Sequence, residues 1–277
     1  MVPLKYEEHG EGLPVLAIHG WQPDRRLMTG CLEPVFATRG GYRRLYPDLP
    51  GMGETPAGDV ASSDDVLAAL LAFVDERIGA APFLVVGESY GGYLARAVVR
   101  ARPDQVLGLA LICPAVSSGE EAEATWQLPE HAVVRPDPEL MATLDPADRA
   151  YQALAVVQSK ETLERFRAEV SSGLALADRA ALARIDRNGE LTVSPESGPP
   201  FPRPTLILTG RQDQVTGFAD LYALLAHYPR ASFAVLDRAG HNLQIEQPGL
   251  LEALTGEWLA RVAEAAGKES TKDGGLM

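Results

Sequence analysis

Residues 84–95 constrain the fold of this chain more than any other stretch, because they join a buried strand to a helix through a very short turn. A valine-rich apolar run leads into Gly87-Glu88-Ser89-Tyr90-Gly91, and helical apolar spacing follows. The pattern G-x-S-x-G places a serine on a turn so sharp that the flanking positions must lack side chains that would clash. It predicts that the Ser89 hydroxyl stands clear of the sheet. Because glycine and serine are common, a simple strand-to-helix loop is the alternative.

Composition narrows the class of protein. The chain has 277 residues, 46% of them apolar, with a formal charge of −13, which suits a soluble globular protein with one large domain or a core plus an insertion. The acidic excess argues against nucleic acid, and no apolar run reaches the ~20 residues of a membrane span. The N-terminus lacks a signal-peptide pattern, so a cytoplasmic location is predicted. Cys31 and Cys113 form neither a disulfide framework nor a zinc pattern, and neither metal nor cofactor is expected.

Apolar runs that alternate with helical patterns predict an α/β fold with a doubly wound, mostly parallel sheet. The first run alternates in polarity and favours an antiparallel strand, whereas the later runs are continuous and favour buried parallel strands. A helix is expected from Ser62-Ser63-Asp64-Asp65, and a last amphipathic helix from Pro248. The predicted strands span residues 4–8, 14–18, 42–46, 83–86, 106–112, 205–209 and 231–236.

Residues 115–200 contain no strand pattern of comparable quality. Helical spacing recurs at Tyr151, Leu154 and Val157, then at Leu163, Phe166 and Val170, then at Leu182 and Ile185. Five prolines between positions 194 and 204 indicate a return linker. We therefore predict a core of residues 1–114 and 201–277 and a helical cap of residues 115–200. Both junctions lie at the sheet edge that carries Ser89, so the cap is expected to cover it.

A serine hydroxyl needs a base to take its proton, and that base needs an orienting carboxylate. Two loops at the carboxyl ends of predicted strands supply them: Asp213 follows the strand 205–209, and His241 follows the strand 231–236. The predicted triad is therefore Ser89 as nucleophile, His241 as base and Asp213 as orienting acid. Asp237 is an outside candidate for the acid.

Five motifs together resemble the α/β-hydrolase superfamily, in its capped, esterase-like branch with a Ser-Asp-His triad. They recur in family order across residues 14–262. Only one strand is predicted before residue 14, so the first strand of the family pattern is missing or truncated. The resemblance implies an oxyanion hole made by the backbone N–H groups of Trp21 and Tyr90. It also implies structural roles for His19 and Asp48. The motifs are His19-Gly20-Trp21, Asp48-Leu49-Pro50-Gly51-Met52-Gly53, Gly87 to Gly92, Gly210-Arg211-Gln212-Asp213 and Gly240-His241.

Some polar residues have open roles. Glu88, next to the serine, either tunes the site or bonds locally. A buried thiol at Cys113 is more often a packing group than a reactive one. The remaining histidines, His9, His131 and His227, are interpreted as bystanders.

The leading hypothesis is a cofactor-free serine hydrolase that cleaves a small-to-medium carboxylic ester or related acyl compound through an acyl-enzyme on Ser89. Such an enzyme is carboxylesterase-like and acts on a small-molecule substrate. The alternatives are a carbon–carbon bond hydrolase of the dienoate type, a perhydrolase, and a small-molecule receptor that retains the fold. Dehalogenases and epoxide hydrolases carry aspartate at the position of Ser89 and are disfavoured. The sequence fixes neither the natural substrate nor the oligomeric state.

Overall fold

The computed structural model describes residues 2–119 and 123–273, with side chains up to Gly267. Within these residues seven strands form one sheet in the order β1-β3-β2-β4-β5-β6-β7. β1 is antiparallel to β3, and every other pair is parallel. This arrangement confirms the predicted doubly wound, mostly parallel α/β sheet. The strands are β1 Tyr6–His9, β2 Leu13–Ile18, β3 Tyr42–Pro47, β4 Phe83–Glu88, β5 Val106–Ile112, β6 Thr205–Gly210 and β7 Ala231–Leu236.

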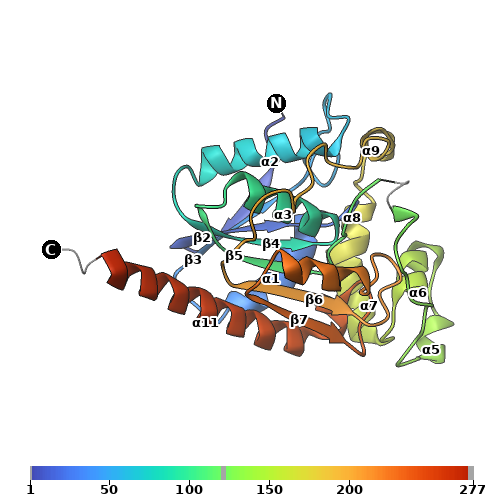
Figure 1. Cartoon of the computed structure of the whole chain (residues 1–277). Helices are drawn as coiled ribbons and strands as arrows, with labels where there is room; N and C mark the ends of the chain where they lie inside the picture. Colours follow the sequence, from blue (N-terminus) through green and yellow to red (C-terminus); the bar gives the residue numbers. More distant parts are fainter. Residues whose placement is uncertain (1, 120–122, 274–277) are drawn as a thin grey trace.

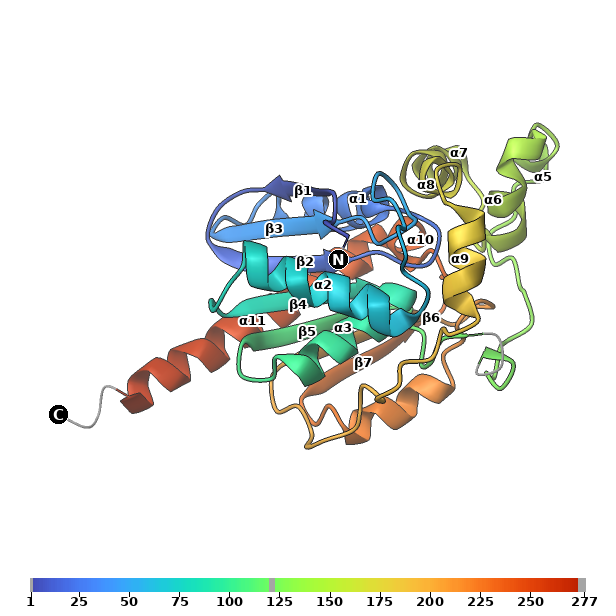
Figure 2. The ribbon, with the colours of Figure 1, turned by 90° about the horizontal axis from the view of Figure 1, so that it is seen from above.

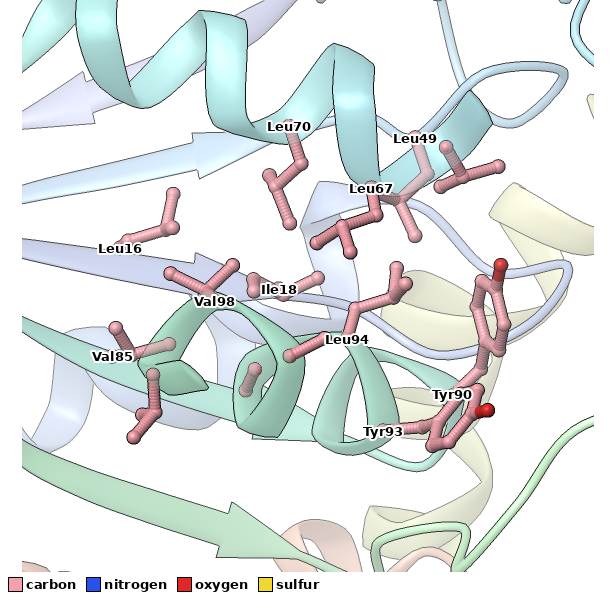
Figure 3. Close-up of a cluster of buried hydrophobic side chains, with 14 of the residues drawn as sticks. Leu16, Ile18, Leu49, Leu67, Leu70, Val85, Tyr90, Tyr93, Leu94 and Val98 are labelled. Carbon is pink, nitrogen blue, oxygen red and sulfur yellow. The ribbon is translucent and has the colours of Figure 1, made fainter. Parts of the chain in front are cut away.

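Helices cover both faces of the sheet (Figure 1). α2 (Ser63–Arg77) and α3 (Tyr90–Ala101) lie on one face, where their leucine and valine side chains meet those of β2 and β4 (Figure 3). α1 (Arg25–Phe36) and α11 (Pro248–Asp273) lie on the other face and share a second apolar cluster. Ser62 caps α2 by accepting a hydrogen bond from the Asp65 N–H, as its sequence predicts.

The helix α1 was not predicted from the sequence. Its interior holds Pro34, which usually breaks a helix, and it opens with two arginines. The helix forms nevertheless, because Leu27, Met28, Leu32 and neighbouring side chains on one face are buried. Tertiary packing here outweighs local propensity.

The segment after β5 lies beyond the carboxyl ends of the parallel strands (Figures 1 and 2). Its described helices are α5 Pro138–Met141, α6 Arg149–Leu154, α7 Lys160–Phe166, α8 Ser172–Leu174 and α9 Arg179–Asp186, with a 3₁₀ turn at Pro146–Asp148 and a π-helical turn at Arg167–Ser171. Helices were predicted around most of these positions, but Val157 is a correction. It lies outside α6, in an extended bridge with Arg135. Its N–H and that of Val156 bond to the Glu246 carboxylate instead of continuing the helix.

These helices pack closely on the core. A Cβ on Gly173 would lie 2.7 Å from the Asp24 nitrogen, so α8 approaches the start of α1 as closely as backbones allow. Tyr151, Phe166 and Val170 belong to the apolar cluster of α1 and α11. The boundaries of the cap at residues 115 and 200 stay a prediction.

The chain is completed by a 3₁₀ helix at Asp220–Ala226, by α10 at Leu243–Glu246 and by α11. α11 continues to Asp273, and residues 274–277 lie outside the described residues. Across residues 2–119 and 123–273, no helix combines the length and apolar character needed to cross a bilayer.

Candidate active site

The turn that carries Ser89 has the strained geometry that its sequence predicts. Ser89 follows the last residue of β4 and has φ of +52°, in the left-handed region that side chains rarely adopt. A Cβ on Gly87 would lie 2.3 Å from the Gly91 carbonyl oxygen, and one on Gly91 would lie 2.2 Å from the Ile18 carbonyl oxygen. A side chain at either position would clash with the backbone, so both positions require glycine. The turn holds the Ser89 side chain at the start of α3, only 7% of the residue being exposed.

Ser89, His241 and Asp213, predicted from three separate loops, are brought together into one chain of hydrogen bonds. His241 Nε2 lies 3.0 Å from Ser89 Oγ. On the other side of the ring, His241 Nδ1 lies 3.1 and 3.2 Å from the two carboxylate oxygens of Asp213. With Asp213 accepting from Nδ1–H, the lone pair of Nε2 faces the serine hydroxyl. This is the arrangement in which an imidazole takes a proton from a nucleophile.

Asp213 is fully buried and held by its own loop. Its carboxylate accepts hydrogen bonds from the backbone N–H groups of Val215 (2.9 Å) and Thr216 (3.0 Å) and from the Thr216 hydroxyl (2.8 Å). Burial alone would raise the pKa of Asp213, but the charge and hydrogen bond of His241 and these N–H groups lower it below its usual value. The carboxylate thus stays ionised. Thr216 was not predicted from the sequence; the available signal was Asp213 itself, because aspartate side chains often accept a hydrogen bond from the backbone two residues on.

The pKa of His241 is moved in the opposite direction. Burial opposes the charged imidazolium, but the charge and hydrogen bond of Asp213, and then the charges of Glu88 and Glu246, raise the pKa to about 9. The site therefore favours the imidazolium that forms when the ring accepts a proton.

Glu88 lies at the same edge of the imidazole as Ser89. Its Oε1 lies 3.5 Å from His241 Nε2, and only 3% of its side chain is exposed. Burial raises the pKa of Glu88 to about 7, against the lowering effect of His241. A Cβ on Gly20 would lie 2.3 Å from Oε2, so the carboxyl group fills the space that this glycine leaves open. The open question about Glu88 thus has a structural answer: its carboxyl group lies against His241.

A cavity of about 380 Å³ opens onto Ser89 and His241. Trp21 and Tyr90, whose backbone N–H groups are the predicted oxyanion hole, both line it, and their rings meet edge to face with centroids 5.0 Å apart. The carboxylates on its wall are Glu88, Glu123 and Asp186, and no lysine or arginine is among its described lining residues. One part of the wall is apolar and comes largely from α1 and the segment after β5: Pro23, Leu27, Ala150, Leu154, Val170 and Leu174.

Glu246 was not predicted from the sequence as part of the site. Its carboxylate is largely buried and accepts from the N–H groups of Val156 (2.6 Å), Val157 (3.2 Å) and Gly240 (2.6 Å). It thereby joins the segment after α6 to the loop that carries His241. No local sequence signal separates this glutamate from other acids near the start of α11.

The remaining candidates lie elsewhere or have structural partners. His19 bonds the Gly20 carbonyl through Nδ1 and accepts from the Leu49 N–H through Nε2, in keeping with its expected role. Asp48 accepts from the backbone N–H groups of Arg25 and Glu54. Asp237 is exposed, and the carboxylate bonded to His241 is that of Asp213.

Potential metal-ligand atoms of Cys113, Asp213 and His241 lie within 4.8 Å of one another. The hydrogen bonds already described occupy the Asp213 carboxylate and Nδ1 of His241. Burial raises the pKa of the Cys113 thiol well above its usual value, which disfavours the thiolate that a metal prefers. Asp213 and His241 are therefore better explained as members of the hydrogen-bond chain to Ser89 than as metal ligands.

Comparison with known proteins gives consistent matches over nearly the whole chain. The model of the alpha/beta hydrolase family matches residues 15–254. A 2-hydroxymuconate semialdehyde hydrolase of Pseudomonas sp. (strain CF600) is 27% identical over 94% of this chain and 91% of its own length. An alpha/beta superfamily hydrolase from Oenococcus oeni PSU-1 superposes with a TM-score of 0.85, at 27% identity over 94% of this chain and 96% of that one. A thermophilic esterase from Thermogutta terrifontis gives a TM-score of 0.64, at 26% identity over 94% and 93% of the two chains.

Proposed function

Because this chain belongs to the alpha/beta hydrolase family, we propose that it is a serine hydrolase that cleaves small-to-medium carboxylic esters or related acyl compounds. The observation that carries the proposal is the hydrogen-bond chain from Ser89 through His241 to Asp213, of which Ser89 and His241 line a cavity. The esterase among the similar structures supports the same class of reaction.

The reaction follows from the geometry. Ser89 Oγ attacks the ester carbonyl as His241 Nε2 takes its proton, and Asp213 stabilises the imidazolium. The backbone N–H groups of Trp21 and Tyr90 donate to the oxyanion that develops on the carbonyl oxygen. His241 then gives its proton to the departing alkoxide, which leaves as the alcohol. A water molecule, deprotonated by His241, then attacks the acyl-enzyme, and His241 passes this proton to Ser89 Oγ as the acid is released.

The cavity supports an acyl group of modest size. About 380 Å³ lies near the small end of the range for small-molecule sites. Its apolar wall, which includes Leu154 and Val170, fits a hydrocarbon chain better than a peptide or a polyanion. We also propose that residues 115–200 act as the cap that forms much of this wall.

Carbon–carbon bond hydrolysis is the second candidate, because the similar Pseudomonas protein is a 2-hydroxymuconate semialdehyde hydrolase. A dienoate substrate carries a carboxylate, which a site would pair with a cation. Glu88, Glu123 and Asp186 on the cavity wall would instead repel it, and no lysine or arginine is among the described lining residues. We therefore rank ester hydrolysis first.

A fluorophosphonate probe, a series of p-nitrophenyl esters from acetate to dodecanoate and a 2-hydroxy-6-oxo-dienoate test the proposal. We expect covalent labelling at Ser89 by peptide mapping, and the highest kcat/KM at short-to-medium acyl chains. The Ser89→Ala variant is the control and should show neither labelling nor turnover. Faster turnover of the dienoate would select the second candidate. Saturable binding without turnover of any compound would indicate a receptor and contradict hydrolysis.

A further inference from the structure

Two neighbours in sequence, Glu88 and Ser89, approach the same nitrogen of His241. Consecutive residues of a strand normally point to opposite faces. Here β4 ends at Glu88, and the positive φ of Ser89 turns the chain, so both side chains reach Nε2, at 3.5 Å and 3.0 Å. The imidazole is therefore held between two carboxyl groups, with Asp213 on Nδ1 and Glu88 beside Nε2.

We infer that Glu88 is a positioning residue for proton transfer: its carboxylate attracts the Nε2–H of the His241 imidazolium and sets the lower pH limit of the reaction. The inference rests on the proposed hydrolase function of the same site. It assigns Glu88 a role that the triad and the oxyanion hole do not include.

The electrostatics support this geometry. An opposite charge within ~4–6 Å favours the charged form of a group, by roughly 1–3 pKa units. Glu88 lies within that range of the ring, at 3.5 Å, and is almost completely removed from water. Because burial raises its own pKa to about 7, its charge appears only as the pH rises into the neutral range. Glu88 and His241 therefore titrate as a coupled pair.

Other ionisable groups on the neighbouring elements do not replace Glu88. Asp213 faces the opposite nitrogen, and the Glu246 carboxylate is engaged by three backbone N–H groups. Burial raises the pKa of both nearby thiols, which keeps them uncharged. These four groups come from four different parts of the chain: Asp213 after β6, Glu246 on α10, Cys31 on α1 and Cys113 after β5.

The test compares pH profiles of kcat/KM for a p-nitrophenyl ester. His241 acts as a base only when neutral, so wild-type activity should fall as the pH drops through its pKa, raised to about 9. Glu88→Gln keeps the shape and removes the charge, so this midpoint should move down by about one pH unit or more. Glu88→Asp, which keeps the charge, should stay closer to the wild type. Asp237→Asn, the same acid-to-amide change at an exposed position, should leave the midpoint unchanged.

A midpoint that is the same in the wild type and Glu88→Gln would overturn the inference, because a purely structural Glu88 would change the rate without moving the midpoint. If Glu88→Gln does not fold, NMR titration of the wild-type imidazoles decides the matter. The His241 signal, assigned by its loss in His241→Gln, should show two inflections, one from its own ring and one from Glu88. A single inflection would refute the coupling. This measurement needs no turnover, so it separates a failure of the inference from a failure of the proposed function.

Discussion

At the scale of single residues, Asp213 and Asp237 offer two acids near His241, and the structure distinguishes between them. Asp213 is fully buried and bonded to Nδ1, whereas Asp237 is exposed. Asp213→Asn should lower kcat for ester hydrolysis by about 10³–10⁴-fold, because an amide no longer fixes the tautomer or stabilises the imidazolium. Asp237→Asn is the matched control and should stay within about twofold of the wild type, as surface substitutions usually do. Steady-state kinetics on one p-nitrophenyl ester gives both values.

Thermal unfolding of both variants would show whether a loss of activity reflects chemistry or misfolding. A variant of Asp213 that folds and retains most of its activity would remove this residue from the triad. A severe loss in Asp237→Asn would move the acid there.

At the scale of elements, Glu246 on α10 joins two segments by three charge-assisted hydrogen bonds from backbone N–H groups. In Glu246→Gln the amide NH₂ replaces one carboxylate oxygen and must face a backbone N–H, so at least one buried donor loses its partner. We expect the free energy of unfolding to fall by about 2 kcal/mol, the usual size for a hydrogen bond to a charged group. The kcat should also fall several-fold, because the Gly240–His241 loop loses its support.

The control for this change is Glu264→Gln, the same substitution on the exposed face of α11. Its unfolding free energy, measured in urea, should match that of the wild type within about 0.5 kcal/mol. Equal stability of the two variants would mean that Glu246 does not fasten these segments together.

At the scale of the whole molecule, the segment after β5 shares both apolar clusters of the core. Tyr151 and Phe166 belong to the cluster of α1 and α11, while Leu182 and Ile185 belong to that of α2 and α3. We therefore expect the proposed cap and the sheet to unfold in one cooperative transition. Hydrogen-exchange pulse labelling across a urea series should give peptides of residues 160–174 and 83–101 the same midpoint.

Residues 130–133 serve as the internal reference, because they are exposed, lie outside helices and strands, and should exchange at every urea concentration. A lower urea midpoint for residues 160–174 than for the strands would contradict a shared core. Such a result would mean that the proposed cap folds as a separate unit.

The sheet and the order of the site residues along the chain could be predicted from local patterns of residues. Continuous apolar runs identify parallel strands because both faces of such a sheet are covered, and the observed strands agree with the predicted ones to within two residues at each end. The glycines around Ser89 indicate a close backbone approach, which is a local steric requirement. Since parallel strands end at one edge, the loops that carry Asp213 and His241 had to lie near Ser89.

Features that depend on contacts between distant parts of the chain could not be predicted from such patterns. The helix α1 forms despite Pro34 because its apolar face is buried, and Val157 leaves its predicted helix because Glu246, 89 positions away, binds its N–H. The meeting of Glu88 with His241 likewise depends on a turn at one residue and on the position of a loop from the far end of the chain. Periodicity reports which face of an element is buried, but not which polar group it meets there, because that partner is chosen by the fold as a whole.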